Sequence, residues 1–288
     1  MMEEEKDNRP LVKDLSEKHA SQLVELRNIL EKEESYCKER YDDLWMLRFL
    51  LSHKKVSKAS AAAISTMNFR KERKINELGD IRHKMINHLE AETSDRNFEI
   101  HRKYMATCKG PLAIIYSLPD PDRGLIQIIT PAQTDPEKFM KELSFDETME
   151  VYLLANEIIF QVLDDITRRT GKLTKLLRIM DMEGYALKDF NRALMKRDAA
   201  ANKALEDHYP GSLGTCIVID APSWINAVWK VVKPLFPKKF VEKIAFADIK
   251  NPKDVKYFLK YVTRDKLWER YGGNNPEWPP SPPSQFWK

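Results

Sequence analysis

Residues 209–246, YPGSLGTCIVIDAPSWINAVWKVVKPLFPKKFVEKIAF, place a strand pattern directly before an unusually apolar helix pattern. The apolar and partly β-branched run Thr215–Ile219 predicts a buried strand, which Asp220 closes. Pro222 suits the first turn of the following helix, because the amide hydrogen that proline lacks would have no partner there. Lys243–Phe246 predicts another strand at the end of the stretch.

The helix predicted between Trp224 and Phe236 is apolar over most of its circumference. Its strongly polar residues are spaced four and three positions apart and therefore share one narrow stripe: Asn226, Lys230 and Lys233. The rest of the surface is formed by Trp224, Ile225, Val228, Trp229, Val231, Val232 and Leu235. Such a helix is either a buried core helix or one that faces something apolar other than water.

Several different short motifs follow one another along the chain in a specific order. From the N-terminus they are Leu47–Leu50, Asp181–Gly184, Tyr209–Pro210, Ala221–Pro222, Val232–Pro234, Lys243–Ile244 and Tyr271–Gly273. In order and spacing they resemble the CRAL-TRIO family of phosphatidylinositol-transfer and retinal- or tocopherol-binding proteins, over roughly residues 43–273. The resemblance implies an α/β fold in which a small all-helical N-terminal domain precedes a lipid-binding domain. That domain would contain a mostly parallel sheet flanked by helices, and a hydrophobic cavity.

Composition narrows the class of protein. The 288 residues carry 48 Lys and Arg against 44 Asp and Glu. This mild positive excess argues neither for nor against nucleic-acid binding. The basic residues do not show the arrangement of a base-stacking platform, so we expect no nucleic-acid partner. Cys37, Cys108 and Cys216 lie far apart, which disfavours a disulfide framework or zinc site. The acidic N-terminus is unlike a signal peptide, and no run approaches the ~18 apolar residues of a membrane span, so we expect a cytoplasmic protein peripheral to membranes.

Periodicity divides the chain into four parts. Residues 1–14 are expected to be disordered, and residues 15–96 to form the helical N-terminal domain. Residues 97–273 form the lipid-binding domain, and residues 274–288 a proline-rich, extended tail that suits a protein partner. The helices predicted in the N-terminal domain span about Leu15–Glu34, Asp43–Leu51 and Ser57–Asn76, followed by a helix or loop over Asp80–Arg96 that connects the domains.

Strand and helix patterns alternate in the larger domain, which favours an α/β core with parallel strands. Leu112–Tyr116 and Leu125–Ile129 flank a turn rich in Pro, Asp and Gly, and we expect them to form a hairpin. Ser144 and Glu147 form a capping-box pattern at the start of a helix that Gly171 ends. The remaining predicted elements are a strand at Leu176–Met180, a helix at Leu187–His208, and a helix with a closing segment within Asn251–Tyr271.

The sequence contains no common catalytic motif: GxSxG, HExxH and GxxxxGK[ST] are all absent. The six histidines are scattered without a metal-ligand spacing on a shared face. Asp181 and Gly184 suit a cap and a tight turn better than a nucleotide switch, because no phosphate loop accompanies them. We therefore expect neither an enzyme nor a cofactor or metal ion, but a bound lipid.

The predicted function is that of a soluble lipid-binding or lipid-transfer protein, which holds one lipid in a gated cavity and exchanges it through transient contact with membranes. The ligand would be phosphatidylinositol, another phospholipid or another hydrophobic small molecule. The alternative is a protein-interaction or regulatory scaffold module that uses the same fold without transfer activity.

The resemblance makes the apolar helix part of a movable gate. The residues expected at the gate and the lipid tails are Trp224, Ile225, Val228, Trp229, Val232, Leu235, Phe236 and Phe240. The nearby lysines either form a basic patch that contacts anionic membranes or are merely solvated: Lys230, Lys233, Lys238 and Lys239, with Lys243 beside them.

The resemblance also places Lys54 and Lys243 on two positions where phosphatidylinositol-transfer proteins hold the inositol phosphate with lysines. Two lysines can neutralise a phosphate as point charges. The rest of that pattern is absent here. Gly211 stands where a glutamate follows Tyr-Pro, and Phe240 stands where the gate carries threonine.

Arg178 shares one face of its predicted strand with Leu176 and Met180. In phosphatidylcholine-binding members of the family, the positions matching Leu176 and Arg178 carry small hydroxyl residues, so that route to phosphatidylcholine is not expected. An unpaired buried charge costs several kcal/mol. Arg178 therefore either pairs with a carboxylate of the protein, for instance from the helix over residues 144–169, or binds a phosphate or carboxylate of the ligand inside the cavity.

Overall fold

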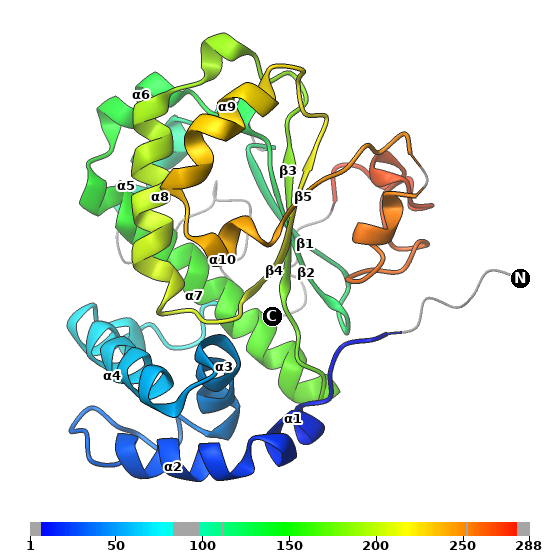
Figure 1. The fold of residues 1–288 in the computed structure, drawn as a ribbon. Helices are drawn as coiled ribbons and strands as arrows, with labels where there is room; N and C mark the ends of the chain where they lie inside the picture. Colours follow the sequence, from blue (N-terminus) through cyan, green and yellow to red (C-terminus); the bar gives the residue numbers. More distant parts are fainter. Residues whose placement is uncertain (1–6, 83–97, 111, 252, 281–288) are drawn as a thin grey trace, which may run out of the picture.

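The structure is a computed structural model and describes residues 7–82, 98–110, 112–251 and 253–280. Within these ranges a helical N-terminal part precedes an α/β part, as the sequence predicts (Figure 1). Most of the predicted connection over residues 80–96 lies outside the described residues. So do residues 1–6 and residues 281–288 of the predicted terminal segments.

The N-terminal part consists of helices whose apolar stripes meet in one core. Its described elements are α1 (Val12–Lys18), α2 (Ala20–Leu30), α3 (Asp43–His53), α4 (Val56–Glu72) and a 3₁₀ helix at Ile75–Glu77. Leu26, Leu47 and Phe49 are fully buried between them. The single helix predicted from Leu15 is two helices, because the backbone leaves the helical region at His19 (φ −109°, ψ 16°).

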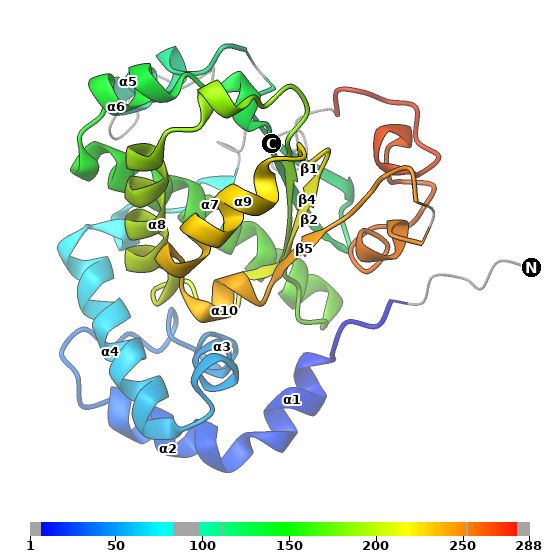
Figure 2. The same cartoon turned by 45° about the horizontal axis from the view of Figure 1, so that its top comes forward.

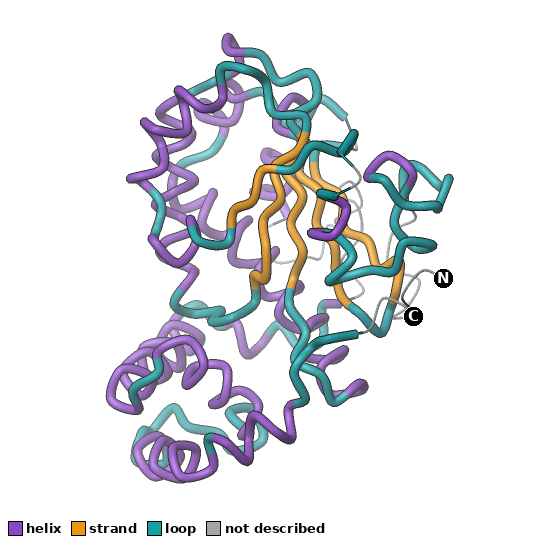
Figure 3. Tube along the Cα trace, turned by 45° about the vertical axis from the view of Figure 1, so that its right-hand side comes forward, coloured by secondary structure: helices purple, strands orange, loops and turns teal. Residues whose placement is uncertain are grey.

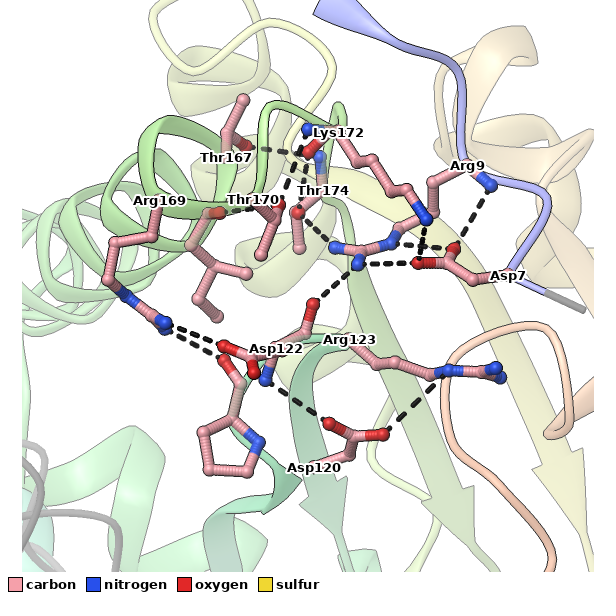
Figure 4. A network of polar contacts seen from close by, with 12 residues as sticks. Asp7, Arg9, Asp120, Asp122, Arg123, Thr167, Arg169, Thr170, Lys172 and Thr174 are labelled. Carbon is pink, nitrogen blue, oxygen red and sulfur yellow. Dashed lines mark hydrogen bonds and ion pairs between the residues drawn. The ribbon is translucent and has the colours of Figure 1, made fainter.

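Residues 7–11, which precede α1, make defined contacts and α1 begins at Val12, which differs from the disorder predicted for these positions. Arg9 donates through Nη1 to the Thr174 hydroxyl at 2.6 Å and through Nη2 to the main-chain carbonyl of Asp122. Asp7 accepts a hydrogen bond from the Lys172 ammonium at 2.9 Å (Figure 4). Asp7 and Arg9 also pair with each other at 2.9 Å, and their other partners lie more than a hundred positions away in sequence.

The strands in the described part of the chain form one sheet in chain order: β1 (Ile114–Asp120), β2 (Gly124–Ile129), β3 (Leu176–Asp181), β4 (Leu213–Ile219) and β5 (Ile244–Phe246). β1 and β2 form the predicted antiparallel hairpin, and β2 to β5 run parallel. The predicted α/β class with a mostly parallel sheet is therefore confirmed.

Helices cover one face of this sheet, on the left in Figure 1. They are α5 (Phe98–Ala106), α6 (Pro136–Glu142), α7 (Phe145–Thr170), α8 (Arg192–Glu206), α9 (Ile225–Val232) and α10 (Lys238–Val241), with 3₁₀ helices at Pro131–Gln133, Leu187–Asp189 and Lys233–Leu235. The long helix α7 begins at the predicted capping box of Ser144 and Glu147, and it ends at Gly171, whose φ of 65° suits glycine.

Two of the helix patterns are interrupted. The predicted helix over residues 224–236 is α9 followed by the 3₁₀ helix Lys233–Leu235, because Pro234 has no amide hydrogen to continue the α-helical hydrogen bonds. The helix expected from Leu187 to His208 begins only at Arg192, where the side chain of Asn191 accepts hydrogen bonds from two amides of the first turn.

The described C-terminal segment, residues 247–251 and 253–280, covers the opposite face of the sheet. Figure 3 shows mostly loop there, and the helix predicted within Asn251–Tyr271 is present only as 3₁₀ turns at Val255–Tyr257 and Glu269–Tyr271. Fully buried side chains anchor these loops on the strands: Phe258, Leu267, Trp268 and Tyr271. Trp278 of the proline-rich tail packs edge-on against Tyr271, with ring centroids 5.4 Å apart. None of the described helices has the length and apolar character needed to cross a membrane.

Candidate functional site

A cavity of about 310 Å³ lies between the sheet and the helices that cover it. α5 to α9 contribute to its walls, and the floor consists of sheet residues. Figure 2 shows α9, above α10, lying between α8 and the strands β4 and β5. Ligand pockets in proteins usually measure about 300–1,000 Å³, so this cavity has the size of a small ligand site.

Two rows of side chains cross the sheet and form the floor of the cavity. Strand register aligns Tyr116, Gln127, Arg178, Cys216 and Ile244 in the first row. The second row lies two residues further along and contains Ile114, Ile129, Met180, Val218 and Phe246. Alternate strand positions point to the same face, and all ten side chains line the cavity. The floor therefore has a polar row beside an apolar one.

Arg178 is the cation at the centre of the polar row. Its Nε donates to the Gln127 Oε1 at 2.7 Å, and the Gln127 Nε2 donates to the Tyr116 hydroxyl at 3.0 Å. Burial raises the pKa of Tyr116 to about 12, so this hydroxyl stays protonated. The chain of two hydrogen bonds orients the guanidinium from its Nε side. Within the described residues no carboxylate forms an ion pair with Arg178, so the pairing with an acidic side chain that we considered is not found there.

A second polar pair lines the helical wall. Tyr152 on α7 donates its hydroxyl to Oδ1 of Asp198 on α8 at 2.7 Å. Burial raises the pKa of Asp198 to about 6, although the hydrogen bond from Tyr152 opposes the shift. The amides of Asn156 and Asn202 donate to main-chain carbonyls one turn earlier in the same helices. These polar groups of the wall are thus satisfied by the protein itself.

The predicted gate helix lies over the cavity. Six of the predicted gate residues line it: Ile225, Val228, Trp229, Val232, Phe236 and Phe240. Trp224 instead packs against Tyr185, with ring centroids 5.7 Å apart, and Leu235 is not among the lining residues of the described chain. Val231 on the outer side is 53% exposed, and Val232 is the buried residue of α9. The helix is therefore apolar toward the cavity and exposed outside, which differs from a buried core helix.

Lysine side chains connect the gate region with the N-terminal helices. Lys239 on α10 donates to the Ser52 main-chain carbonyl at 3.0 Å, near the end of α3. Lys54 caps that helix in the left-handed conformation (φ 61°) and is exposed. The two segments that carry Lys54 and Lys239 therefore meet. Lys230, Lys233 and Lys238 are also exposed.

Lys243 lies in an electropositive part of the site. Burial lowers the pKa of its ammonium, Glu206 opposes this, and the positive charges of Lys175, Lys239 and Arg178 lower it further. Lys243 precedes β5, whose first residue belongs to the polar row. The structure thus brings Lys243 near Arg178, whereas no direct contact joins Lys243 to Lys54 among the described residues.

The sequence analysis did not select Tyr116, Gln127, Tyr152 or Asp198. One signal was present: Gln127 interrupts the apolar run of its strand, as Arg178 interrupts the next one. Tyr152 and Asp198 gave no such signal, because polar side chains are ordinary in helices of this kind and their meeting depends on how α7 and α8 pack.

Comparisons with known proteins point to one family. The family model described as CRAL/TRIO domain matches residues 110–273. The chain is 25% identical over 260 residues to the CRAL-TRIO domain-containing protein F28H7.8 of Caenorhabditis elegans, covering 86% of this chain and 58% of that protein. It is 25% identical over 142 residues to the phosphatidylinositol/phosphatidylcholine transfer protein SFH12 of Arabidopsis thaliana, covering 49% of this chain and 26% of that protein. The chain therefore spans less than two thirds of the length of each of these relatives.

A third relative and a solved structure agree with this. The CRAL-TRIO domain-containing protein C3H8.02 of Schizosaccharomyces pombe is 30% identical over 98 residues, which are 34% of this chain and 20% of that protein. The crystal structure of Sfh5 superimposes with a TM-score of 0.51 at 11% identity, covering 82% of this chain and 79% of that chain. At this identity the superposition bears on the fold alone.

Proposed function

Because the chain belongs to the CRAL/TRIO domain family, which includes lipid-transfer proteins, we propose that it binds one lipid in the cavity and exchanges it at membranes. The observation that carries this proposal is the cavity of about 310 Å³ behind α9. Its second floor row and the inner side of α9 supply apolar walls for a hydrocarbon chain. Burying each methylene there contributes about 0.8 kcal/mol.

The exchange step of the proposal rests on the construction of α9. Its inner side holds Trp229 and Val228 against the cavity, while its outer side is exposed. If α9 lifted away from the sheet, the cavity would open and Trp229 and Val228 would face the bilayer. The acyl chains of the bilayer would then cover these apolar side chains. The exposed lysines around α9 and α10 would then face anionic lipid head groups, so membrane contact is transient and peripheral.

Phosphatidylinositol is the phospholipid that we propose for the exchange. Two observations support it. SFH12, which matches 49% of this chain, is named a phosphatidylinositol/phosphatidylcholine transfer protein. Lys54 lies at the junction with α10, and Lys243 lies beside the polar row of the cavity floor. No cofactor is part of the proposal.

The test is to purify the full chain, extract it and identify co-purifying lipid by native and lipid mass spectrometry. We expect one lipid per chain. Trp229→Asp should reduce its occupancy at least about tenfold, because a carboxylate on the cavity wall would lose its hydration. The matched control is Val231→Asp, which places the same charge on the exposed side of α9 and should retain the lipid.

Circular dichroism of both variants monitors folding. A folded wild-type chain that contains no extractable lipid and takes up none from vesicles would overturn the proposal. Equal lipid occupancy in the two variants would overturn the role of α9. An extracted lipid other than an inositol lipid would remove phosphatidylinositol while leaving lipid binding in place.

A further inference from the structure

The guanidinium of Arg178 has unused hydrogen-bonding capacity inside the cavity. A guanidinium carries five N–H donors, and Nε uses one of them on Gln127. Among the described residues, neither terminal nitrogen of Arg178 has a hydrogen-bond partner, and the side chain lines the cavity. The pair of terminal nitrogens is the part of the group that fits a carboxylate or a phosphate oxygen pair.

The surroundings of Arg178 favour an anion there. Lys243 directly precedes the polar-row residue of β5 and adds positive charge near Arg178, part of which Glu206 offsets. Gln127 and Tyr116 cannot neutralise this charge, because the amide and the protonated phenol carry none. Charge-assisted hydrogen bonds are about twice as strong as neutral ones, and a site of low dielectric strengthens them further.

The space beside Arg178 suits a hydrocarbon chain. The neighbouring row of the floor is apolar, with Met180 and Val218 two positions along the strands, and Trp229 faces it from α9. A volume of about 310 Å³ lies within the range for ligand pockets and has room for a hydrocarbon chain beside Arg178.

We propose that the cavity selects amphiphiles with a single acidic head, a carboxylate or a phosphate monoester, which Arg178 binds through its terminal nitrogens while the hydrocarbon chain lies along the apolar row toward α9. This inference rests on the proposed function, since it names a ligand class of the same cavity. The head group of such an amphiphile would lie inside the protein. The head group of phosphatidylinositol, in contrast, is proposed to lie near Lys54 at the surface.

The competing explanation is that Arg178 balances Asp198, one of two acidic residues that line the cavity in the described part of the chain. The other, Asp189, accepts the main-chain amide of Ala186 at 3.1 Å. No ion pair joins Arg178 and Asp198 in the described structure, and Asp198 already accepts the hydroxyl of Tyr152. The two explanations predict different effects of Asp198→Asn on the preference for acidic ligands. If Arg178 served to balance Asp198, this substitution would restore whatever the loss of Arg178 removes. Under our proposal it leaves the preference for acids intact.

The experiment compares palmitate, hexadecyl phosphate and hexadecanol, which share a chain and differ in the head, by titration calorimetry on the delipidated full chain. We expect the wild type to bind at least one acid about ten- to a hundredfold more tightly than the alcohol, the range given by hydrogen bonds to charged groups. Arg178→Gln should abolish this preference without weakening hexadecanol. Arg178→Lys should restore part of it, since the charge returns without the planar fork.

Val231→Gln is the matched control: it adds the same amide on the exposed outer side of α9 instead of in the cavity, and it should leave the ratio of acid to alcohol affinity unchanged. Sodium acetate, which has the head without the chain, should not compete. Equal binding of acid and alcohol by the wild type, or a preference that persists in Arg178→Gln, overturns the inference and leaves the lipid-binding proposal standing. Recovery of the preference in the Arg178→Gln, Asp198→Asn double variant overturns it as well. A folded wild type that binds none of the three ligands contradicts the proposed function itself.

Discussion

The two faces of the central sheet differ in what covers them, although both belong to the same short strands. On β3, Leu177 and Ile179 are fully buried against the C-terminal segment, whereas Arg178 and Met180 border the cavity. The C-terminal segment reaches the strands directly through buried rings such as Phe258. α9 leaves a volume between itself and the sheet. One closely covered face can stabilise the fold, so the other is free to hold a ligand.

The largest expected effect tests this division of roles. Ile179→Ala should lower the free energy of unfolding by about 2–5 kcal/mol, because it leaves a new cavity in a closed core. Met180→Ala, the next residue on the opposite face, should lower it by about 1 kcal/mol or less, since it only enlarges a space that exists already. Urea denaturation of both variants measures the difference. Similar losses at the two positions would mean that both faces are packed alike in solution.

The helical wall opposite the cavity face of the sheet carries an ionisable group, Asp198 on α8. It gives the second largest expected effect on the free energy of unfolding. Its pKa is raised from 3.8 to about 6 by burial, and part of its surface faces the cavity. Between these pH values the folded chain holds a proton that the unfolded chain has released. The free energy of unfolding therefore falls as the pH rises from about 4 to about 6, and the loss persists above pH 6. With partial solvation we expect about 2 kcal/mol.

Asp198→Asn should remove this term and stabilise the chain at pH 7 by a similar amount. The measurement is the difference between the unfolding profiles of wild type and variant at several pH values, in which other titrating groups cancel. A flat difference for Asp198→Asn would show that water solvates this carboxylate fully.

The sequence predicted which residues share a face of β3 but not how each face is covered. Alternation places Leu177 with Ile179 and Arg178 with Met180, and the structure agrees. In a sheet covered on both sides, however, the two faces are similarly apolar. Arg178 was the one departure that drew attention to the cavity side. The volume itself depends on how far α9 stands from the strands, and that distance is set by packing between segments remote in sequence.

The same limit explains the error at the N-terminus. Composition and position suggested a disordered start, but Asp7 and Arg9 pair with each other and with residues remote in sequence. Their partners, Asp122, Lys172 and Thr174, belong to the hairpin turn and the turn before β3. Local signals were sufficient for the capping box of α7. The break at Pro234 was missed, although its cause is local as well, because proline has no amide hydrogen.

The smallest expected effect concerns the outer side of α9, which contrasts with its cavity side in the same way as the two faces of the sheet. Lys230 is exposed there, and a lysine near an anionic bilayer contributes about 1 kcal/mol. Lys230→Ala should therefore weaken binding to vesicles that contain phosphatidylserine by about fivefold at low salt. The effect should shrink as added salt shortens the Debye length. Lys13→Ala, which removes the same charge from exposed α1, is the control and should leave vesicle binding unchanged. Vesicle binding that ignores both phosphatidylserine content and salt would mean that the lysines around α9 are merely solvated, and that the apolar side of the helix alone brings the protein to a membrane.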